Sequence, residues 1–298
     1  MAFYDKYTGV LRRLKLVYAI SNLWNYKYLK RNKPLYEKYQ IKRLIWQSIS
    51  AKHFGKLPQI ADLVTSNEKW EREGYLHLEQ YYAIDFVNRI NEALALALSS
   101  GDVAFNYTGK KVLFAHKKVA SLKEIINDTS LRELLESLTQ EKIVPFQSIN
   151  FQYGSEQAAH SDSVHMATYP QGGLIAIWVA LDDIDEDNGP LFYYPGSHKL
   201  PYAENTAMGN TTGPVLAVNP NKNYEEYQQR IIEENGLKAE VLSAKKGDVF
   251  IWHANLLHGG MPHLNKEKTR RSMVVHYFVK DRICYHELSQ RPAVVKEI

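Results

Sequence analysis

The chain has 298 residues, of which 45% are hydrophobic and 12% aromatic, so it can bury a large core and is not a disordered protein. Its single cysteine, Cys284, excludes an intrachain disulfide and favours a reducing compartment. Residues 1–60 carry thirteen Lys and Arg against two acidic residues, a charge of +11. Because the net charge of the chain is +4, residues 61–298 carry −7. No apolar run is long enough to span a membrane and no secretory signal is evident, so we expect a cytoplasmic protein.

Residues 1–69 are expected to form a basic, amphipathic helical segment. Apolar residues recur at helical spacing between Thr8 and Phe54, Pro34 separates two candidate helices, and aromatic residues are interleaved with the basic ones. Such a helix pair would pack its apolar stripe on the main domain, or it would make a peripheral contact with an anionic membrane surface. A phosphorylated substrate also suits this charge, whereas no recognition motif for nucleic acid accompanies it.

The next segment is expected to contain a short strand followed by helices. Residues 73–78 are typical of a strand, and the helix after them would bury four apolar residues: Ile84, Val87, Ile90 and Leu94. Two further helices are predicted from capping boxes, in which each side chain bonds the other residue's backbone N–H: Ser121 with Glu124, and Ser130 with Glu133. We expect these helices to cover one face of a sheet.

From Ile143 onward the hydrophobic pattern changes to that of strands. Turn residues separate short β-rich runs: Ile149–Tyr153, His160–Met166, Leu174–Leu181, Leu191–Tyr194, Glu240–Leu242, Val249–Trp252 and Ser272–Val279. Many short strands after a helical front predict a mainly β fold with flanking helices, a double-stranded β-helix of the jelly-roll or cupin kind. This domain would span residues 70–298, with a barrel core at about 143–280 and a lid-like insertion at about 202–236.

The residues best suited to chemistry are His160, Asp162 and, far downstream, His258. On an extended chain His160 and Asp162 would leave the same face, because side chains alternate with period two. Two imidazoles and one carboxylate on one side of a metal form the facial triad of non-haem Fe(II) oxygenases, which leaves positions open for a cosubstrate and dioxygen. Three further histidines are not expected to bind metal: His276 could line the pocket, and His165 and His263 could contact substrate.

Arg270 is a candidate clamp for the far carboxylate of a 2-oxo acid cosubstrate, because a guanidinium offers a permanent charge and a planar fork. Ser272 has the same strand parity and could add a hydroxyl contact. Arg271 points to the opposite face in this register, but a slip of one residue would give it the role instead. The sequence leaves this choice open.

Residues from about 70 to 280 resemble the phytanoyl-CoA dioxygenase family of Fe(II)- and 2-oxoglutarate-dependent oxygenases. Motifs in a fixed order carry the resemblance: EGY at 73–75, HSD at 160–162, IWVALDDIDEDNGPLFYYPGSHKLP at 177–201, GDVFIWHANLLHGG at 247–260 and RRSMVVHYF at 270–278. The resemblance implies that His160, Asp162 and His258 bind iron, that Arg270 holds 2-oxoglutarate, and that Trp178 lines the cosubstrate pocket. Residues 1–60 lie outside it.

The resemblance further implies an enzyme, a dioxygenase that decarboxylates 2-oxoglutarate at Fe(II) and hydroxylates an unactivated carbon of a small molecule. That substrate could be phosphorylated, lipid-linked or carrier-bound. Asp162 favours hydroxylation, because related iron halogenases lack this carboxylate. A hypothesis from another class is a non-catalytic jelly-roll module that binds a ligand in its barrel, and measurement of iron uptake and 2-oxoglutarate decay would distinguish the two.

Overall fold

The computed structural model describes residues 68–205, 207–208, 220–288 and 291–292. The basic helical segment expected over residues 1–69 lies outside these residues, apart from the start of helix α4 (Glu68–Glu73). Part of the expected insertion at 202–236 is also outside them, but its second half forms helix α8 (Pro220–Glu234). Among the described residues, none of the helices combines the length and the apolar character that a membrane crossing requires.

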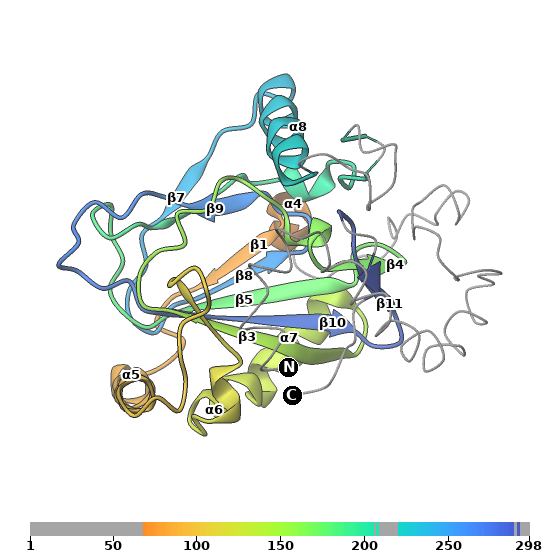
Figure 1. Cartoon of the computed structure of the whole chain (residues 1–298). Coiled ribbons are helices and arrows are strands. Elements are labelled where there is room, and N and C mark those ends of the chain that lie inside the picture. The colour runs from red at the N-terminus through yellow and green to blue at the C-terminus, as the bar shows by residue number, and fades with distance from the viewer. Residues whose placement is uncertain (1–67, 206, 209–219, 289–290, 293–298) are drawn as a thin grey trace.

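Six antiparallel strands form the major sheet, in the order β1-β8-β5-β10-β3-β2 (Figure 1). Their bounds are β1 (Tyr75–Leu78), β2 (Lys111–Leu113), β3 (Ile143–Phe151), β5 (Leu174–Ala180), β8 (Val249–His253) and β10 (Ser272–Val279). Every residue of β5 and β10 is buried, so these two strands are covered on both faces. This explains why their sequences are nearly continuous apolar runs.

Three helices cover the outer face of the major sheet: α5 (Ile84–Ser99), α6 (Leu122–Ile126) and α7 (Thr129–Thr139). Helices α5 and α6 lie below the sheet in Figure 1. Val87, Ile90 and Leu94 of α5 are buried in the core that this layer forms, as predicted. The prediction for Ile84 was wrong, since its side chain is 59% exposed. The helix begins at this residue, and its buried stripe begins one turn later.

The two predicted capping boxes do not form. Asp128 caps α7 instead, because its carboxylate accepts a hydrogen bond from Leu131 N–H at 3.0 Å. The same carboxylate also accepts bonds from the hydroxyls of Tyr81 and Tyr82, at 3.3 and 3.1 Å. Helix α7 therefore begins before Ser130. At α6 the N-cap residue is Ser121, but its side chain makes no capping hydrogen bond.

The inner face of the major sheet packs on a minor sheet with the order β7-β6-β9. Its strands are β6 (Leu191–Tyr193), β7 (Glu240–Leu242) and β9 (His258–Gly260). Trp178 and Phe250 of the major sheet meet Leu191 and Tyr193 of the minor sheet in this second core. A third sheet has the order β12-β11-β4, with bounds β4 (Ala167–Tyr169), β11 (Ile283–His286) and β12 (Arg291–Pro292). Two facing antiparallel sheets with helices outside confirm the predicted jelly-roll class.

Residues 160–166 do not form the expected strand. His160 makes an isolated bridge, Asp162–Val164 form the 3₁₀ turn η3, and β4 begins only at Ala167. Two other short 3₁₀ turns are η2 (Ala115–Lys117) and η4 (Ser197–Lys199). His160 and Asp162 are therefore brought together by a bridge followed by a turn, and not by the alternation of a strand.

Candidate active site

His160 and His258 face each other across a pair of backbone hydrogen bonds. The N–H of each residue donates to the carbonyl oxygen of the other, both at 2.9 Å. His258 is the first residue of β9, which pairs with β6, so the minor sheet fixes its position. Through the bridge, this strand also fixes His160.

Both imidazoles are held in the tautomer that can bind a metal through Nε2. His160 Nδ1 lies 2.9 Å from the carbonyl oxygen of Ala158, and His258 Nδ1 lies 3.0 Å from that of Leu256. Because a carbonyl oxygen can only accept, each Nδ1 carries a proton, which leaves Nε2 as the ring nitrogen available to a metal. Burial lowers the pKa of His160 to about 3, so its ring is neutral at pH 7. Neutral imidazole is the form that metal binding requires.

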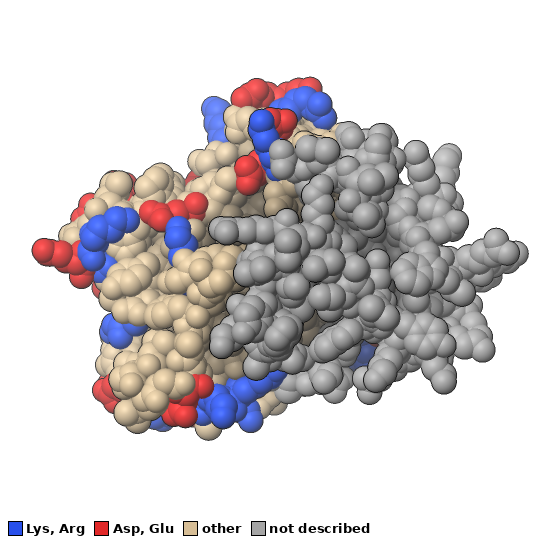
Figure 2. Space-filling view, viewed as in Figure 1, with Lys and Arg blue, Asp and Glu red and all other residues tan. Residues whose placement is uncertain are grey.

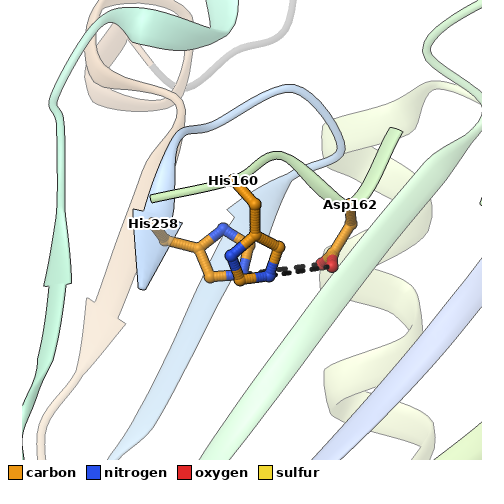
Figure 3. Close-up of side chains that lie close together, drawn as sticks. All are labelled: His160, Asp162 and His258. Carbon is orange, nitrogen blue, oxygen red and sulfur yellow. Dashed lines mark ion pairs between the residues drawn. The ribbon is translucent and has the colours of Figure 1, made fainter. Parts of the chain in front are cut away.

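Asp162 completes the cluster (Figure 3). Its Oδ1 lies 4.0 Å from His160 Nε2, and its Oδ2 lies 3.8 Å from His258 Nε2. The ligand atoms of all three residues lie within 4.8 Å of one another. Two nitrogen or oxygen ligands, each about 2 Å from one ion, are at most about 4 Å apart, so small side-chain movements would let the three share an ion. Imidazole and carboxylate donors in this number suit Fe(II).

Two side chains from the inner face of the major sheet hold the Asp162 carboxylate. Trp252 Nε1 donates to its Oδ2 at 2.8 Å, and His276 Nε2 lies 3.4 Å from the same oxygen. Burial alone would raise the pKa of Asp162, but His258 and His276 hold it below its ordinary value. The carboxylate therefore stays ionised. Trp252 was not predicted as a site residue, although its position two residues after the buried Phe250 places it on the same inner face.

Arg270 is buried on the inner face, and none of the described acidic residues pairs with it. Its Nε donates to the carbonyl oxygen of Gly189 at 3.1 Å, its Nη1 donates to Ser272 Oγ at 2.8 Å, and its Cζ lies 4.9 Å from the centre of the Trp178 ring. The residue is only 3% exposed, and burial lowers its pKa to about 10, so it remains charged at pH 7. Within the described part of the chain, no carboxylate oxygen lies within 4.0 Å of its guanidinium nitrogens. A buried cation without a counter-charge is costly, so an anionic ligand would complete this site.

Arg271 points away from this site. Its Nη2 lies 2.6 Å from Asp182 Oδ1, and its Nε donates to the same carboxylate. Ser272 pairs with Ala180 on one side and with Phe151 on the other, which leaves Arg270 and Ser272 together on the inner face. The register slip considered from the sequence is therefore not the register of the structure.

Lys111 on β2 is a cation that the sequence analysis did not single out. It pairs with Phe151, and its Nζ lies 5.8 Å from the centre of that ring. Burial lowers the pKa of Lys111, while the nearby negative charge of Asp162 opposes this shift. The site thus contains a second cation besides Arg270. Lys111 was missed because β2 has only three residues, which is too short for the alternation of side chains to show which face Lys111 occupies.

The three other histidines have different positions. His276 contacts Asp162, and the ring of His165 lies 6.2 Å from that of His160, so both line the site. His263 instead braces a loop, since its Nε2 contacts the carbonyl oxygens of Asn265 and Lys268 at 2.8 and 3.0 Å. This geometry does not favour the expected contact of His263 with substrate.

The family model for phytanoyl-CoA dioxygenase (PhyH) matches residues 70–272, which is more than half of the chain and includes the cluster, Arg270 and Ser272. The chain belongs to the phytanoyl-CoA dioxygenase family. Curated members that it matches include phytanoyl-CoA dioxygenase domain-containing protein 1 of Mus musculus, 31% identical over 90 residues, which are 29% of this chain and 30% of that protein. Peroxisomal phytanoyl-CoA dioxygenase of Bos taurus is 25% identical over 132 residues, 44% of this chain and 36% of that protein. The matched segments span about a third of these relatives.

Solved structures share the fold of this phytanoyl-CoA dioxygenase family member. One is SnoK, a non-haem α-ketoglutarate-dependent carbocyclase from nogalamycin biosynthesis, with a TM-score of 0.58, 15% identity, and coverage of 74% of this chain and 84% of that one. Another is EctD from S. alaskensis with 2-oxoglutarate and 5-hydroxyectoine, with a TM-score of 0.57, 18% identity, and coverage of 80% and 85%. At these identities the likeness shows the fold, and it agrees with the predicted jelly roll.

Proposed function

We propose that the protein is an Fe(II)- and 2-oxoglutarate-dependent oxygenase that hydroxylates an unactivated carbon of a small molecule. The observation that supports this most is a metal-ligand cluster on the same inner face as a buried guanidinium that pairs with no carboxylate of the described residues. A dicarboxylate cosubstrate suits this arrangement, because one end could bind the metal while Arg270 binds the carboxylate at the other end. Membership of the phytanoyl-CoA dioxygenase family supports the same reaction class.

His160, Asp162 and His258 would hold the iron and leave its other positions for 2-oxoglutarate and dioxygen. Bound iron would supply the activation of dioxygen and the oxidative decarboxylation of 2-oxoglutarate. Arg270 and Ser272 would bind the distal carboxylate of the cosubstrate, and the Trp178 ring would support the guanidinium. Lys111 would contribute a second positive charge to the binding of this dianion.

The chain's own part in the reaction is positioning. Trp252 and His276 hold the Asp162 carboxylate, and the carbonyl oxygens of Ala158 and Leu256 hold the two imidazoles in the correct tautomer. Partners of this kind commonly change metal affinity or activity by about 10- to 100-fold when they are removed. The presence of Asp162 supports hydroxylation over halide transfer, since a bound halide would need the position that this carboxylate takes.

Asp162→Ala tests the ligand assignment directly. Wild-type protein incubated with Fe(II), 2-oxoglutarate and oxygen should form succinate, and Asp162→Ala or His160→Ala should abolish both iron retention and succinate formation. Succinate is measured by mass spectrometry, and iron by elemental analysis. The matched control is Asp185→Ala, which removes an exposed carboxylate and should keep wild-type values.

Full iron-dependent succinate formation by Asp162→Ala would refute the assignment. A wild-type protein that takes up no iron and consumes no 2-oxoglutarate would favour the alternative function, a non-catalytic jelly-roll module that binds a ligand. The substrate would be sought in cell extract incubated with the enzyme and ¹⁸O₂, where a labelled product would identify it.

The finer parts of the proposal concern the substrate class and the location. A phosphorylated, lipid-linked or carrier-bound substrate suits the basic residues 1–60, and the same residues would give a cytoplasmic protein a peripheral contact with anionic membranes. In this proposal residues 1–69 form the basic helical segment, whose residues 1–60 make the contact, and residues 70–298 form the oxygenase domain. Co-sedimentation with anionic liposomes at low salt tests the contact, and an absence of binding there would remove it.

A further inference from the structure

Helix α8 contacts the segment that carries two of the proposed ligands through the side chain of Tyr224. Ser161 lies between His160 and Asp162, and its N–H donates to Tyr224 Oη at 2.7 Å. The Tyr224 hydroxyl also donates to the Ser161 carbonyl oxygen at 3.4 Å. Tyr224 is 3% exposed, and burial raises its pKa to about 12, so the hydroxyl is protonated at neutral pH. One residue of the insertion thus satisfies both backbone groups of the residue between two ligands.

The hydrogen bonds continue from Ser161 to the segment that precedes His258. Ser161 Oγ lies 2.9 Å from Ser163 Oγ, which donates to Asn255 Oδ1 at 3.0 Å. Asn255 Nδ2 then donates to the carbonyl oxygens of His198 and Leu200, at 3.2 and 2.7 Å. Ser161, Ser163 and Asn255 are all buried. This chain of hydrogen bonds therefore runs from α8 behind both segments that supply the cluster.

The rest of α8 has a narrow buried stripe. Tyr224 packs in a small apolar core with Val164 and Leu288, two residues outside the insertion. The opposite side of the helix carries exposed ion pairs of Lys222 with Glu226 and of Arg230 with Glu234. Figure 2 shows charged side chains gathered at the top of the molecule, where α8 lies in Figure 1. Among the described contacts of α8, the Tyr224 hydrogen bonds are the ones that reach the residue between two proposed ligands.

We propose that Tyr224 is a positioning residue that couples the docking of α8 to the geometry of the metal cluster. This inference rests on the proposed function, because it assumes that the cluster binds a metal. With the hydroxyl present, residues 160–163 are ordered before the metal arrives; without it, metal binding must also order them and is weaker. Coupling between two binding events is reciprocal, so metal binding must in turn stabilise docked α8.

Tyr224→Phe tests the coupling, because it keeps the packed ring and removes the hydroxyl. Mn(II) serves as a metal probe that takes the same carboxylate and imidazole ligands, and its affinity is measured by calorimetry in the presence of 2-oxoglutarate. We expect the affinity of Tyr224→Phe to be at least about fivefold lower than that of wild type. In wild type, Mn(II) with 2-oxoglutarate should slow hydrogen exchange of the α8 amides, and this slowing should be lost in the variant.

Tyr227→Phe is the matched control, because it removes the hydroxyl of another tyrosine on α8 that packs against the same small core. It should keep the wild-type affinity and exchange pattern. Unchanged Mn(II) affinity in Tyr224→Phe, or exchange of wild-type α8 that does not respond to metal, overturns the proposal while leaving the proposed function intact. If the variant folds poorly, hydrogen exchange of the wild-type protein with and without metal still tests the proposal. A wild-type protein that binds neither Mn(II) nor 2-oxoglutarate overturns both.

Discussion

Arg270 and Arg271 are neighbours in the sequence with opposite environments. Arg270 is buried beside Trp178 and Ser272, whereas Arg271 is half-buried and paired with Asp182. Successive residues of an extended chain point to opposite faces, so the two arginines offer the same charge at two different sites. Replacing each arginine in turn therefore removes the same charge at two locations, so a difference between the two variants reports the location.

Arg270→Ala should raise the KM for 2-oxoglutarate by about 10- to 100-fold. Hydrogen bonds to charged groups contribute about 1.5–3 kcal/mol, and each 1.4 kcal/mol corresponds to a factor of ten. Arg271→Ala should leave this KM unchanged, because Arg271 faces away from the site. Steady-state succinate formation at varied 2-oxoglutarate concentration measures both values. Equal increases in the two variants would contradict the clamp assignment.

At the scale of residues, the sequence could predict candidate ligands that belong to a motif. It could not predict the side chains that hydrogen-bond to those ligands. The HSD triplet and Arg270 lie in recognisable runs, and the parity of Arg270 and Ser272 followed from strand periodicity. Trp252 contacts Asp162 across 90 residues of sequence, and Tyr224 contacts Ser161 across 63. Such contacts depend on the folded path of the chain, which local periodicity does not report.

At the scale of elements, long buried strands were the most predictable. The predicted bounds of β10 are those of the structure, and β5 differs by one residue, because apolar runs there end at turn residues. Residues 160–166 were assigned wrongly because a bridge and a 3₁₀ turn produced a polar and apolar pattern like that of a strand. Strands of three residues, such as β2 and β9, are too short to show a period.

Asp128→Ala tests which residue begins α7. It should lower the free energy of unfolding by about 2 kcal/mol, because an N-cap is worth about 1 kcal/mol and the Tyr81 and Tyr82 hydroxyls also lose their acceptor. Ser130→Ala, the matched control from the predicted capping box, should change it by less than about 0.5 kcal/mol. Urea denaturation measures both. Equal losses would mean that Ser130 also caps the helix.

At the scale of the whole molecule, histidines outside the cluster are held in neutral form at buried or half-buried positions. Burial lowers the pKa of His116 and His198 to about 4 and that of His253 to about 3, from the ordinary value of 6.5. Between pH 6.5 and about 4, the unfolded chain therefore takes up protons that the folded chain does not. The free energy of unfolding must fall as the pH falls through this window.

Urea denaturation at pH 7 and pH 5 should show this loss, with a ceiling of about 6 kcal/mol for the three histidines, since each contributes at most about 1.4 kcal/mol per pH unit below pH 6.5. His116→Asn should reduce the loss by about 1 kcal/mol, because one of the titrating groups is gone. Equal stability at the two pH values would mean that these histidines titrate in the folded protein as they do in the unfolded chain.

The overall architecture was predictable because the order of motifs and the change from helical to strand periodicity agree with each other. Family and jelly-roll class are confirmed by the family match and the solved structures. The division at residue 69 stays a prediction, since almost all of the first part lies outside the described residues. The charge of +11 in residues 1–60 follows from composition alone. It predicts an anionic partner for this segment but not the structure of the segment.

The backbone pair formed by His160 and His258 makes the site sensitive to the number of residues as well as to their identity. Side chains on paired strands alternate between the two faces, so a one-residue insertion or deletion next to either histidine would turn its ring away from Asp162. Both histidines would still be present, and a comparison of compositions or motifs would not reveal the damage. Surface loops elsewhere tolerate changes in length far better. A homologue that keeps all three ligands but alters the local spacing should therefore be treated as having lost the site.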